Sequence, residues 1–257
     1  MWLISNVKIE KQNSGFKYLQ IGDYTFITDE MTPVRGQDGA LWFYEGYILN
    51  RDGLKSKYSS MSAEQLPGTL SAEFGDKFIN QIKGNFILIQ LHHNAFKVFS
   101  DRFGIKKFFY WQNENEFVIS NNLKALSRLV MLKLSSFGMS VYALTYHFTG
   151  GLTAFENVYH NQPAEYISLK DGLLKSKTYW EPEDLLNIDL KPVSIKEISG
   201  CLKTATLSTM QPLEPVSLSL TGGADTRNLL SIFLSMAVHP HLYTYGNPHS
   251  NDCRHDQ

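Results

Sequence analysis

The sequence predicts an α+β fold, with a sheet-rich front domain over residues 1–190 and the beginning of an α/β domain over residues 191–257. The first observation behind this prediction is that aromatic residues, 13% of the chain, gather in short segments of alternating apolar and polar residues. Such segments are typical of strands. The second observation is that the pattern after residue 190 changes to helix, strand, glycine-containing loop, helix and strand, which is typical of a parallel α/β unit.

The front domain contains three predicted β-hairpins, in each of which two apolar segments flank a short polar turn. The paired segments are residues 85–91 with 96–100, 108–111 with 117–120, and 164–169 with 173–179. Two further strands and two helices are predicted at residues 41–44, 47–49, 72–81 and 122–129. Strands therefore outnumber helices in the expected front domain.

The second domain begins after a predicted linker over residues 181–192. Ser194 and Glu197 form a capping box, Ser-x-x-Glu, that predicts the start of a helix. The elements expected after this helix are a strand at residues 215–220, a helix at 227–236 and a strand at 242–245. An open parallel sheet needs more strands and helices than these to cover its faces, so we expect a second domain that is truncated at Gln257.

Composition excludes several classes of partner. The formal net charge is −1 and the basic residues are scattered, which argues against nucleic acid or an acidic membrane as a partner. The chain start lacks the features of a secretory signal, and the longest apolar stretch, residues 229–238, is too short to cross a bilayer. Two cysteines, Cys201 and Cys253, cannot build a disulfide framework. We therefore expect a cytoplasmic protein.

The segment Thr-Gly-Gly-Ala-Asp-Thr, residues 221–226, joins a predicted strand directly to a helix. Gly222 and Gly223 allow the backbone to adopt positive φ and to approach a ligand. The helix start offers free N–H groups and the positive end of the helix dipole, which favour phosphate or pyrophosphate. The hydroxyl groups of Thr221 and Thr226 add donors, whereas Asp225 would repel a bare phosphate unless a divalent cation lay between them. The segment therefore predicts a site for a nucleoside triphosphate with Mg²⁺.

Other interpretations of this segment remain. It lacks the Gly-Lys-Ser/Thr ending of a Walker A loop and the G-x-G-x-x-G spacing of a dinucleotide-binding turn. It also fits a tight turn between strand and helix, in which Asp225 stabilises the helix start through its charge alone. The residues of the loop by themselves leave both interpretations open.

Four segments resemble the asparagine synthetase family, in the family's own order. Residues 221–226 resemble its pyrophosphatase loop, Ser-Gly-Gly-x-Asp-Ser, with Thr at both hydroxyl positions. Residues 101–110 resemble its Asp-Arg-x-Gly-x-Lys-Pro-Leu-Tyr-Tyr hairpin, residues 119–126 its Ala-Ser-Glu-x-Lys-Ala-Leu segment, and residues 83–86 the Gly-x-Phe start of a strand. The ordered set is much more specific than the loop alone.

The resemblance implies a four-layer αββα sandwich of the class II glutamine amidotransferase kind, an Ntn-type fold, followed by the truncated start of an α/β ATP-pyrophosphatase domain. It implies that Thr221, Gly222, Gly223, Asp225 and Thr226 bind ATP, with Asp225 on Mg²⁺. The implied activity is that of an ATP-dependent carbon–nitrogen ligase, which adenylates the carboxylate of a small molecule or peptide before an amine displaces AMP. Residues up to Gln257 are not expected to catalyse this reaction alone. A homodimer is among the expected assemblies.

The front domain departs from the family at three points, which together predict that glutaminase activity is lost. Trp2 stands where the family has its Cys nucleophile, and it supplies no nucleophile. Glu45 stands at an Asn of the oxyanion hole, where its charge would oppose a developing oxyanion, and Tyr47 replaces a Glu that grips the glutamine amine. The family's His-Arg-Gly-Pro-Asp segment is matched only faintly, by residues 35–38, which lie too close to Gly46.

In these losses the chain resembles members of the superfamily that lack the Cys, such as β-lactam synthetases and lasso-peptide cyclases. Arg227, directly after the loop, also resembles these divergent members. The alternative function is a non-catalytic binding or scaffold module that keeps an amidotransferase-like fold with a vestigial loop. A working glutaminase is the third hypothesis.

Overall fold

The computed structural model describes residues 1–9, 15–29, 32–50, 54, 58, 61–62, 64–170, 172–186, 192–210 and 215–246. Contacts within the chain divide it into two units, Met1–Ile188 and Asp189–Gln257. Residues 187–191 of the predicted linker, Asp171 in the predicted turn of the third hairpin, and Cys253 lie outside the described residues.

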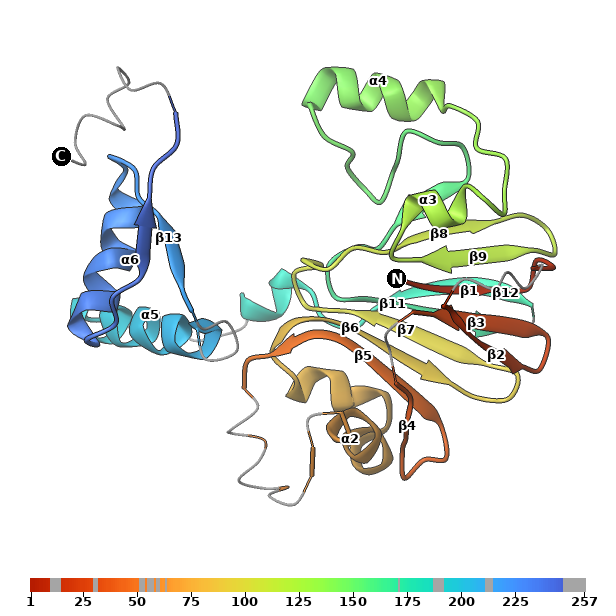
Figure 1. Cartoon of the computed structure of the whole chain (residues 1–257), viewed down its shortest axis with the longest axis horizontal. Helices are drawn as coiled ribbons and strands as arrows, with labels where there is room; N and C mark the ends of the chain where they lie inside the picture. Colours follow the sequence, from red (N-terminus) through yellow and green to blue (C-terminus); the bar gives the residue numbers. More distant parts are fainter. Residues whose placement is uncertain are drawn as a thin grey trace. The chain divides into compact units, whose positions relative to one another are not determined.

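Unit 1 contains two antiparallel sheets among its described residues (Figure 1). Sheet A has the strand order β10-β8-β9-β1-β3-β2. Its strands are β1 (Trp2–Ser5), β2 (Lys17–Ile21), β3 (Tyr24–Thr28), β8 (Phe109–Gln112), β9 (Phe117–Ser120) and β10 (Val158–His160). Sheet B has the order β12-β11-β7-β6-β5-β4. Its strands are β4 (Val34–Arg35), β5 (Leu41–Ile48), β6 (Gly84–Leu91), β7 (Phe96–Ser100), β11 (Glu165–Lys170) and β12 (Leu173–Thr178).

The three predicted hairpins are confirmed as β6–β7, β8–β9 and β11–β12. Strand β1 was not predicted from the sequence, although it lies inside sheet A between β9 and β3. All four of its residues are buried, so it has no alternation of apolar and polar residues to reveal it. The first strand of the chain is therefore central to the fold.

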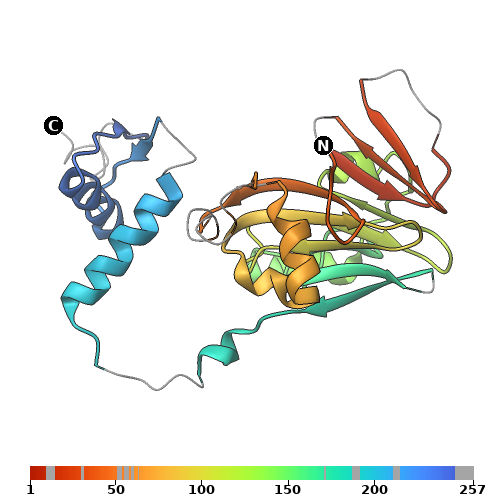
Figure 2. The same cartoon turned by 90° about the horizontal axis from the view of Figure 1, so that it is seen from below.

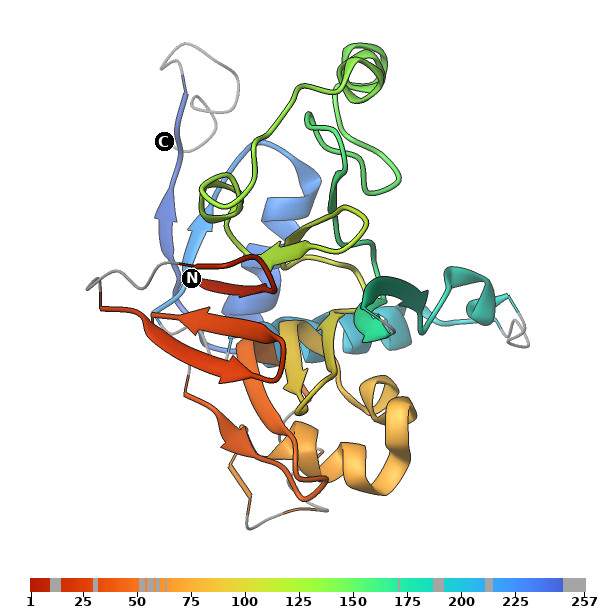
Figure 3. The same cartoon turned by 90° about the vertical axis from the view of Figure 1, so that its right-hand side faces the viewer.

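The sheets and helices of unit 1 form four layers. Phe26 of sheet A and Phe43 of sheet B meet in the core between the sheets, with ring centroids 4.2 Å apart. Helix α2 (Leu66–Phe74) and the 3₁₀ helix η1 (Gly75–Gln81) cover the outer face of sheet B, while α3 (Leu123–Leu126) covers sheet A. Figure 3 shows α2 and the 3₁₀ helix on one side of the strands and α3 with α4 on the other. The expected αββα sandwich is thus confirmed.

The sequence predicts two strands, at residues 41–44 and 47–49, whereas the structure has one continuous strand, β5. Gly46 makes this continuity possible. Its φ is +115°, and a Cβ atom there would lie 2.1 Å from the backbone oxygen of Asn85 on β6. Only glycine fits this conformation and this close approach. The glycine therefore marks a tight contact inside the sheet, whereas the sequence pattern places it between two strands.

The predicted helices differ from the observed ones in position. The helix expected at residues 72–81 begins earlier, as α2, and changes to a 3₁₀ helix at Gly75, whose φ of +55° ends the α-helix. The helix expected at 122–129 is the shorter α3, capped by Asn122. Helix α4 (Ser136–Thr145) was not predicted; it is capped by Ser135 and ends at Tyr146, whose φ is +59°.

Unit 1 ends with the short 3₁₀ helix η2 (Pro182–Leu185). The described elements of unit 2 are helix α5 (Ile195–Met210), strand β13 (Ser217–Ser219), helix α6 (Ala224–Ser235) and strand β14 (His241–Tyr243) (Figure 2). The predicted capping box is confirmed, because Ser194 and Glu197 bond to each other's backbone N–H groups at 3.2 and 2.8 Å. Strands β13 and β14 are parallel. The predicted order of elements is therefore confirmed, with α6 beginning three residues before the expected Arg227.

Among the described residues, no helix is both long enough and apolar enough to cross a membrane.

Candidate functional site

The first candidate site surrounds Trp2, at the position where the sequence predicts a lost nucleophile. The Trp2 side chain is fully buried and packs against Phe108, with ring centroids 6.0 Å apart. Its backbone is held by β9 and the residue that follows it: Trp2 N donates to Asn121 Oδ1 at 3.0 Å, and Ser120 Oγ donates to Trp2 O at 2.7 Å. The large indole ring of the first residue of β1 is therefore enclosed by the core.

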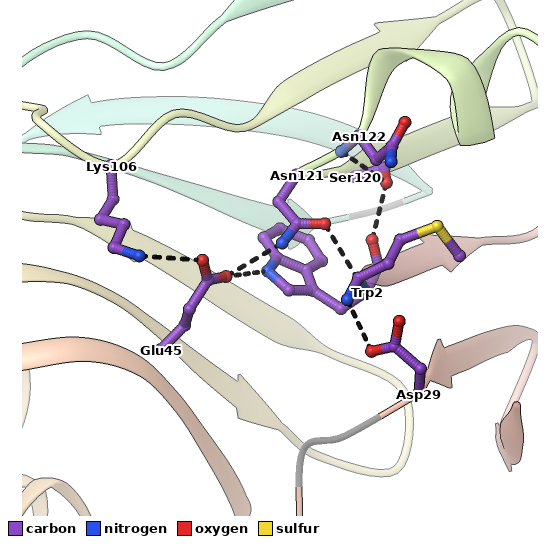
Figure 4. Close-up of polar contacts among 8 residues, drawn as sticks. Trp2, Asp29, Glu45, Lys106, Ser120, Asn121 and Asn122 are labelled. Atoms are coloured by element: carbon purple, nitrogen blue, oxygen red, sulfur yellow. Dashed lines mark hydrogen bonds and ion pairs between the residues drawn. The ribbon is translucent and has the colours of Figure 1, made fainter.

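Glu45 lies at the centre of the polar contacts around this ring (Figure 4). One of its carboxylate oxygens, Oε2, accepts hydrogen bonds from Trp2 Nε1 at 2.9 Å and from Asn121 Nδ2 at 3.0 Å. The other, Oε1, pairs with Lys106 Nζ at 3.3 Å. The carboxylate is thus compensated by one cation and two neutral donors, which is what a partly buried charge requires.

Lys106 is positioned by two buried polar residues. The carboxylate of Asp101, which is fully buried, accepts a hydrogen bond from the backbone N–H of Lys106 at 3.1 Å. Asn161, also fully buried, donates its side-chain N–H to the carbonyl oxygen of Lys106 at 3.1 Å. Because both backbone groups of Lys106 are held, its side chain leaves the loop in a defined direction, toward Glu45.

Sequence reasoning identified Trp2 and Glu45 but missed Lys106 and Asn121 as their partners. Both missed residues belong to segments that resemble the family, residues 101–110 and 119–126. The sequence could not show that these residues contact Glu45, because all the contacts are distant along the chain. The hydrogen bonds of Glu45 with Trp2 and Asn121 span 43 and 76 positions, and its ion pair with Lys106 spans 61.

The side chains around Trp2 differ in chemistry from those that the family resemblance leads us to expect in a glutaminase. An indole N–H is a donor and no nucleophile, and the free thiol among the described residues, Cys201, is exposed on α5 in unit 2. A carboxylate such as Glu45 accepts hydrogen bonds, whereas an oxyanion hole must donate them. The segment that matches the family only faintly forms a turn before β5, where Asp38 accepts hydrogen bonds from Trp42 Nε1 at 3.2 Å and Gln90 Nε2 at 2.9 Å.

The second candidate site is the loop of residues 221–226, between β13 and α6. The threonines at its two ends contact each other, with 3.1 Å between Thr221 Oγ1 and Thr226 Oγ1. Thr226 Oγ1 also accepts from the Thr221 backbone N–H at 3.2 Å, and Thr221 Oγ1 accepts from Gly223 N at 3.2 Å. The hydroxyl groups that were predicted to bind phosphate therefore close the loop on itself in this structure.

The backbone of the loop corrects one expectation. Gly223 has φ −70° and ψ 153°, which is extended backbone, so it does not adopt the positive φ that the sequence interpretation assigned to it. The reason is that Gly223 is the N-cap of α6, a position that favours extended backbone. A Cβ atom at Gly223 would lie 3.2 Å from Thr221 Oγ1, a tight contact. The glycine thus serves the close packing of the loop.

Asp225 lies in the first turn of α6 and is exposed. It makes no hydrogen bond or ion pair with any described residue, so both carboxylate oxygens are available. Across the described residues, no group of three or more His, Cys, Asp or Glu side chains could hold a metal ion. Asp225 is accordingly one carboxylate without protein co-ligands, and its assignment to Mg²⁺ stays a prediction.

Comparison with known proteins supports the assignment of unit 1. A protein of Methanocaldococcus jannaschii, named as a glutamine-hydrolysing asparagine synthetase, is 22% identical over 217 residues, which cover 79% of this chain and 42% of that protein. The chain therefore spans less than half the length of this relative.

Two solved structures are also similar, each at 11% identity. An allosteric regulatory enzyme of purine biosynthesis has a TM-score of 0.43 over 89% of this chain and 53% of its own. The glutamine phosphoribosylpyrophosphate amidotransferase of B. subtilis has a TM-score of 0.42 over 86% of this chain and 51% of its own.

The family model of the glutamine amidotransferase domain matches residues 27–180, which is more than half of the chain and begins after Trp2. The match covers sheet B, the strands β8, β9 and β10 of sheet A, and the loop that carries Lys106. The chain therefore belongs to the glutamine amidotransferase domain family.

Proposed function

We propose that this chain is the N-terminal part of an asparagine synthetase-like, ATP-dependent ligase that forms amides without a glutaminase of its own. The observation that carries the first half of the proposal is the strand–loop–helix of unit 2, in which Thr-Gly-Gly-Ala-Asp-Thr links a strand of a parallel pair to α6. Ligands of open parallel sheets bind at the carboxyl ends of the strands, and this loop follows the carboxyl end of β13.

The residues of the loop fit ATP with Mg²⁺ in their chemistry. Thr221, Gly222, Gly223 and Thr226 would hold the pyrophosphate part of ATP through hydroxyl and backbone N–H groups, aided by the positive end of the α6 dipole. Asp225, whose oxygens are free of described partners, would share Mg²⁺ with the phosphates, as is usual for this ion. Bound Mg²⁺ would neutralise charge on the phosphates. The threonine contact would have to open for both hydroxyl groups to reach a ligand.

The contacts of Trp2 support the proposed loss of glutaminase activity. The indole fills the space next to the start of β1, and Glu45 holds it there with a hydrogen bond of 2.9 Å. The carboxylate at Glu45 would destabilise the negative charge that develops on an amide oxygen under attack. Ammonia or an amine must then come from solution or from the substrate itself, and the carboxylate partner is a small molecule or a peptide.

The test has two assays on different proteins. The 257-residue chain should release no glutamate from glutamine, and it should bind Mg²⁺–pyrophosphate in calorimetry, with Asp225→Asn weakening binding at least about tenfold because the cation loses its carboxylate. Glu183→Gln, a change outside the loop, is the matched control and should leave binding unchanged. The complete gene product should release pyrophosphate from ATP with aspartate and ammonia, but not with glutamine as the nitrogen donor. Glutamate release by the chain would refute the proposed loss.

A second candidate, a non-catalytic binding or scaffold module, is favoured by one observation. The hydroxyl groups of Thr221 and Thr226 contact each other at 3.1 Å, so the loop is closed by its own residues. In that case pyrophosphate binding would be weak, independent of Mg²⁺ and unaffected by Asp225→Asn. The same calorimetric series therefore separates the two candidates.

A further inference from the structure

A small cleft opens between the two sheets of unit 1, at the edge where β8 and β10 of sheet A face β11 and β12 of sheet B. Its volume is about 200 Å³. The residues that line the cleft come from both sheets and are Tyr110, Gln112, Tyr159, Ile167, Leu174 and Ser176. Ile167 belongs to the apolar core between the sheets, and Tyr110 and Leu174 pack against that core. The cleft therefore extends from the sheet edge to the core.

The carboxylate of Glu165 is buried next to this cleft. Glu165 precedes Ile167 by two residues on β11, so both side chains point to the same face of sheet B, the one that meets sheet A. Glu165 is only 5% exposed. Burial raises the pKa of the Tyr110 hydroxyl, and the charge of Glu165 raises it further, because one negative charge disfavours another nearby. The carboxylate of Glu165 thus lies near the hydroxyl of Tyr110, across the space between the sheets.

This buried carboxylate has only part of the partners that its charge requires. Its Oε2 atom accepts a hydrogen bond from the backbone N–H of Gln162 at 2.7 Å. Its Oε1 atom accepts none from the described residues, and no described Lys, Arg or His forms an ion pair with Glu165. Glu45, although it is less buried, has both an ion pair and two neutral donors. Because a buried charge needs an opposite charge and hydrogen bonds, the Glu165 carboxylate lacks a cationic partner.

The other polar groups of the cleft also suit a cation that donates hydrogen bonds. The hydroxyl groups of Tyr110, Tyr159 and Ser176 make no hydrogen bond with any described residue, and each oxygen can accept one. The two tyrosines occupy paired positions of β8 and β10, with ring centroids 5.7 Å apart. The faces of tyrosine rings attract cations. The cleft therefore combines a carboxylate oxygen, hydroxyl acceptors and aromatic rings.

A primary ammonium group meets these requirements, because it carries a positive charge and three N–H donors and accepts no hydrogen bond. The volume of about 200 Å³ lies below the roughly 300–1,000 Å³ of sites that enclose larger ligands, so a short ligand or the end of a longer one fits. Tyr159 is 39% exposed, which leaves the cleft open to solvent on its side. We propose that the cleft binds the protonated amino end of an aliphatic amine, with the ammonium group on Glu165 Oε1 and beside the two tyrosines.

Titration of the 257-residue chain with n-propylammonium, followed by amide NMR spectra, tests this proposal. We expect saturable shifts in β8, β10, β11 and β12. At equal concentration, n-propanol, which has no charge, and tetramethylammonium, which has no N–H donor, should bind at least about tenfold more weakly. Glu165→Gln keeps an acceptor for Gln162 N but removes the charge, and it should weaken binding at least about tenfold. Glu156→Gln, at an exposed position of unit 1, is the matched control and should leave binding unchanged.

A second variant tests the cleft without changing the buried carboxylate. Ser176→Leu, at an exposed position of β12, fills the cleft with apolar atoms and should abolish binding, while circular dichroism shows an intact fold. If Glu165→Gln does not fold, Ser176→Leu decides the outcome. The proposal is overturned if the native chain shows no saturable shifts, if n-propanol or tetramethylammonium binds as tightly as n-propylammonium, or if a folded variant of either kind binds like the native chain. None of these measurements involves ATP or residues 221–226, so failure here leaves the proposed function standing.

Discussion

At the scale of single residues, Glu45 links elements that are far apart in the chain. It lies on β5 of sheet B and accepts hydrogen bonds from Trp2 on β1 of sheet A and from Asn121 just after β9. Lys106 completes the set from the loop after β7. Glu45 thus ties the two sheets together. Its carboxylate acts there as an acceptor of hydrogen bonds, including the one from the indole N–H.

The contacts of Glu45 predict a graded loss of stability. Glu45→Gln keeps an acceptor oxygen and loses only the ion pair with Lys106, so it should lower the free energy of unfolding by about 1 kcal/mol or less. Glu45→Ala leaves the buried indole N–H of Trp2 without an acceptor and should cost about 2–3 kcal/mol. Urea denaturation followed by circular dichroism measures both. Glu114→Gln, in an exposed turn, is the control, and an equal effect of all three changes would contradict the assigned role of Glu45.

At the scale of elements, strand and helix ends are decided by residues with special backbone or capping roles. Gly46 allows β5 to continue beside β6, and Gly75 ends α2. Ser194 and Glu197 start α5 through reciprocal hydrogen bonds. The sequence revealed the capping box because its two residues are three positions apart. It did not reveal the role of Gly46, because the partner strand begins 38 positions later, at Gly84.

Gly46→Ala should disturb the pairing of β5 with β6. Its Cβ atom would lie 2.1 Å from Asn85 O, and its φ of +115° is unfavourable for alanine. We expect a loss of about 3 kcal/mol or more in the free energy of unfolding. Gly39→Ala is the matched control, because Gly39 has φ +79° but open space around its Cβ position, and it should cost only about 1 kcal/mol. Equal losses would mean that the close approach to β6 is unimportant.

The stability of the first turn of α5 should depend on pH. The hydrogen bond from the Ser194 hydroxyl, and then the one from its backbone N–H, hold the pKa of Glu197 below the 4.5 of an unperturbed glutamate. A lowered carboxyl pKa stabilises the helix above pH 4.5, and this stabilisation is lost as the pH falls through the lowered value. Ser194→Ala should raise the pKa of Glu197 toward 4.5 and weaken the pH dependence. NMR titration of the Glu197 carboxyl carbon measures this pKa in both proteins. A pKa that is the same with and without Ser194→Ala would contradict the capping role.

At the scale of the whole molecule, the two units differ greatly in the core that they enclose. Unit 1 has three clusters of buried apolar residues, one between the sheets and one outside each sheet. In the described part of unit 2, the buried cluster consists of Met210, Leu218 and Phe233. Small domains bury too little apolar surface to be stable without further contacts. The stability of the chain therefore resides mainly in unit 1.

Separate expression of the units tests this difference. Residues 1–188 should retain the circular dichroism of a sheet-rich domain and should unfold cooperatively on heating, because their three apolar clusters lie within the unit. Residues 189–257 should show no cooperative transition, because their small core leaves the apolar faces of α5 and α6 in water. Thermal melts of the two pieces and of the whole chain provide the comparison. A cooperative melt of residues 189–257 alone would contradict this account.

The features that depend on neighbouring residues could be predicted from the sequence. These are the three hairpins, the capping box of α5 and the strand–loop–helix around residues 221–226, each recorded in a few consecutive positions. The tertiary structure alone decided that β1 lies inside sheet A and that Lys106 and Asn121 meet Glu45. It also decided that the threonines of the loop contact each other. The physical reason is that periodicity and capping act within one or two turns of chain, whereas these contacts form only when segments distant in sequence pack together.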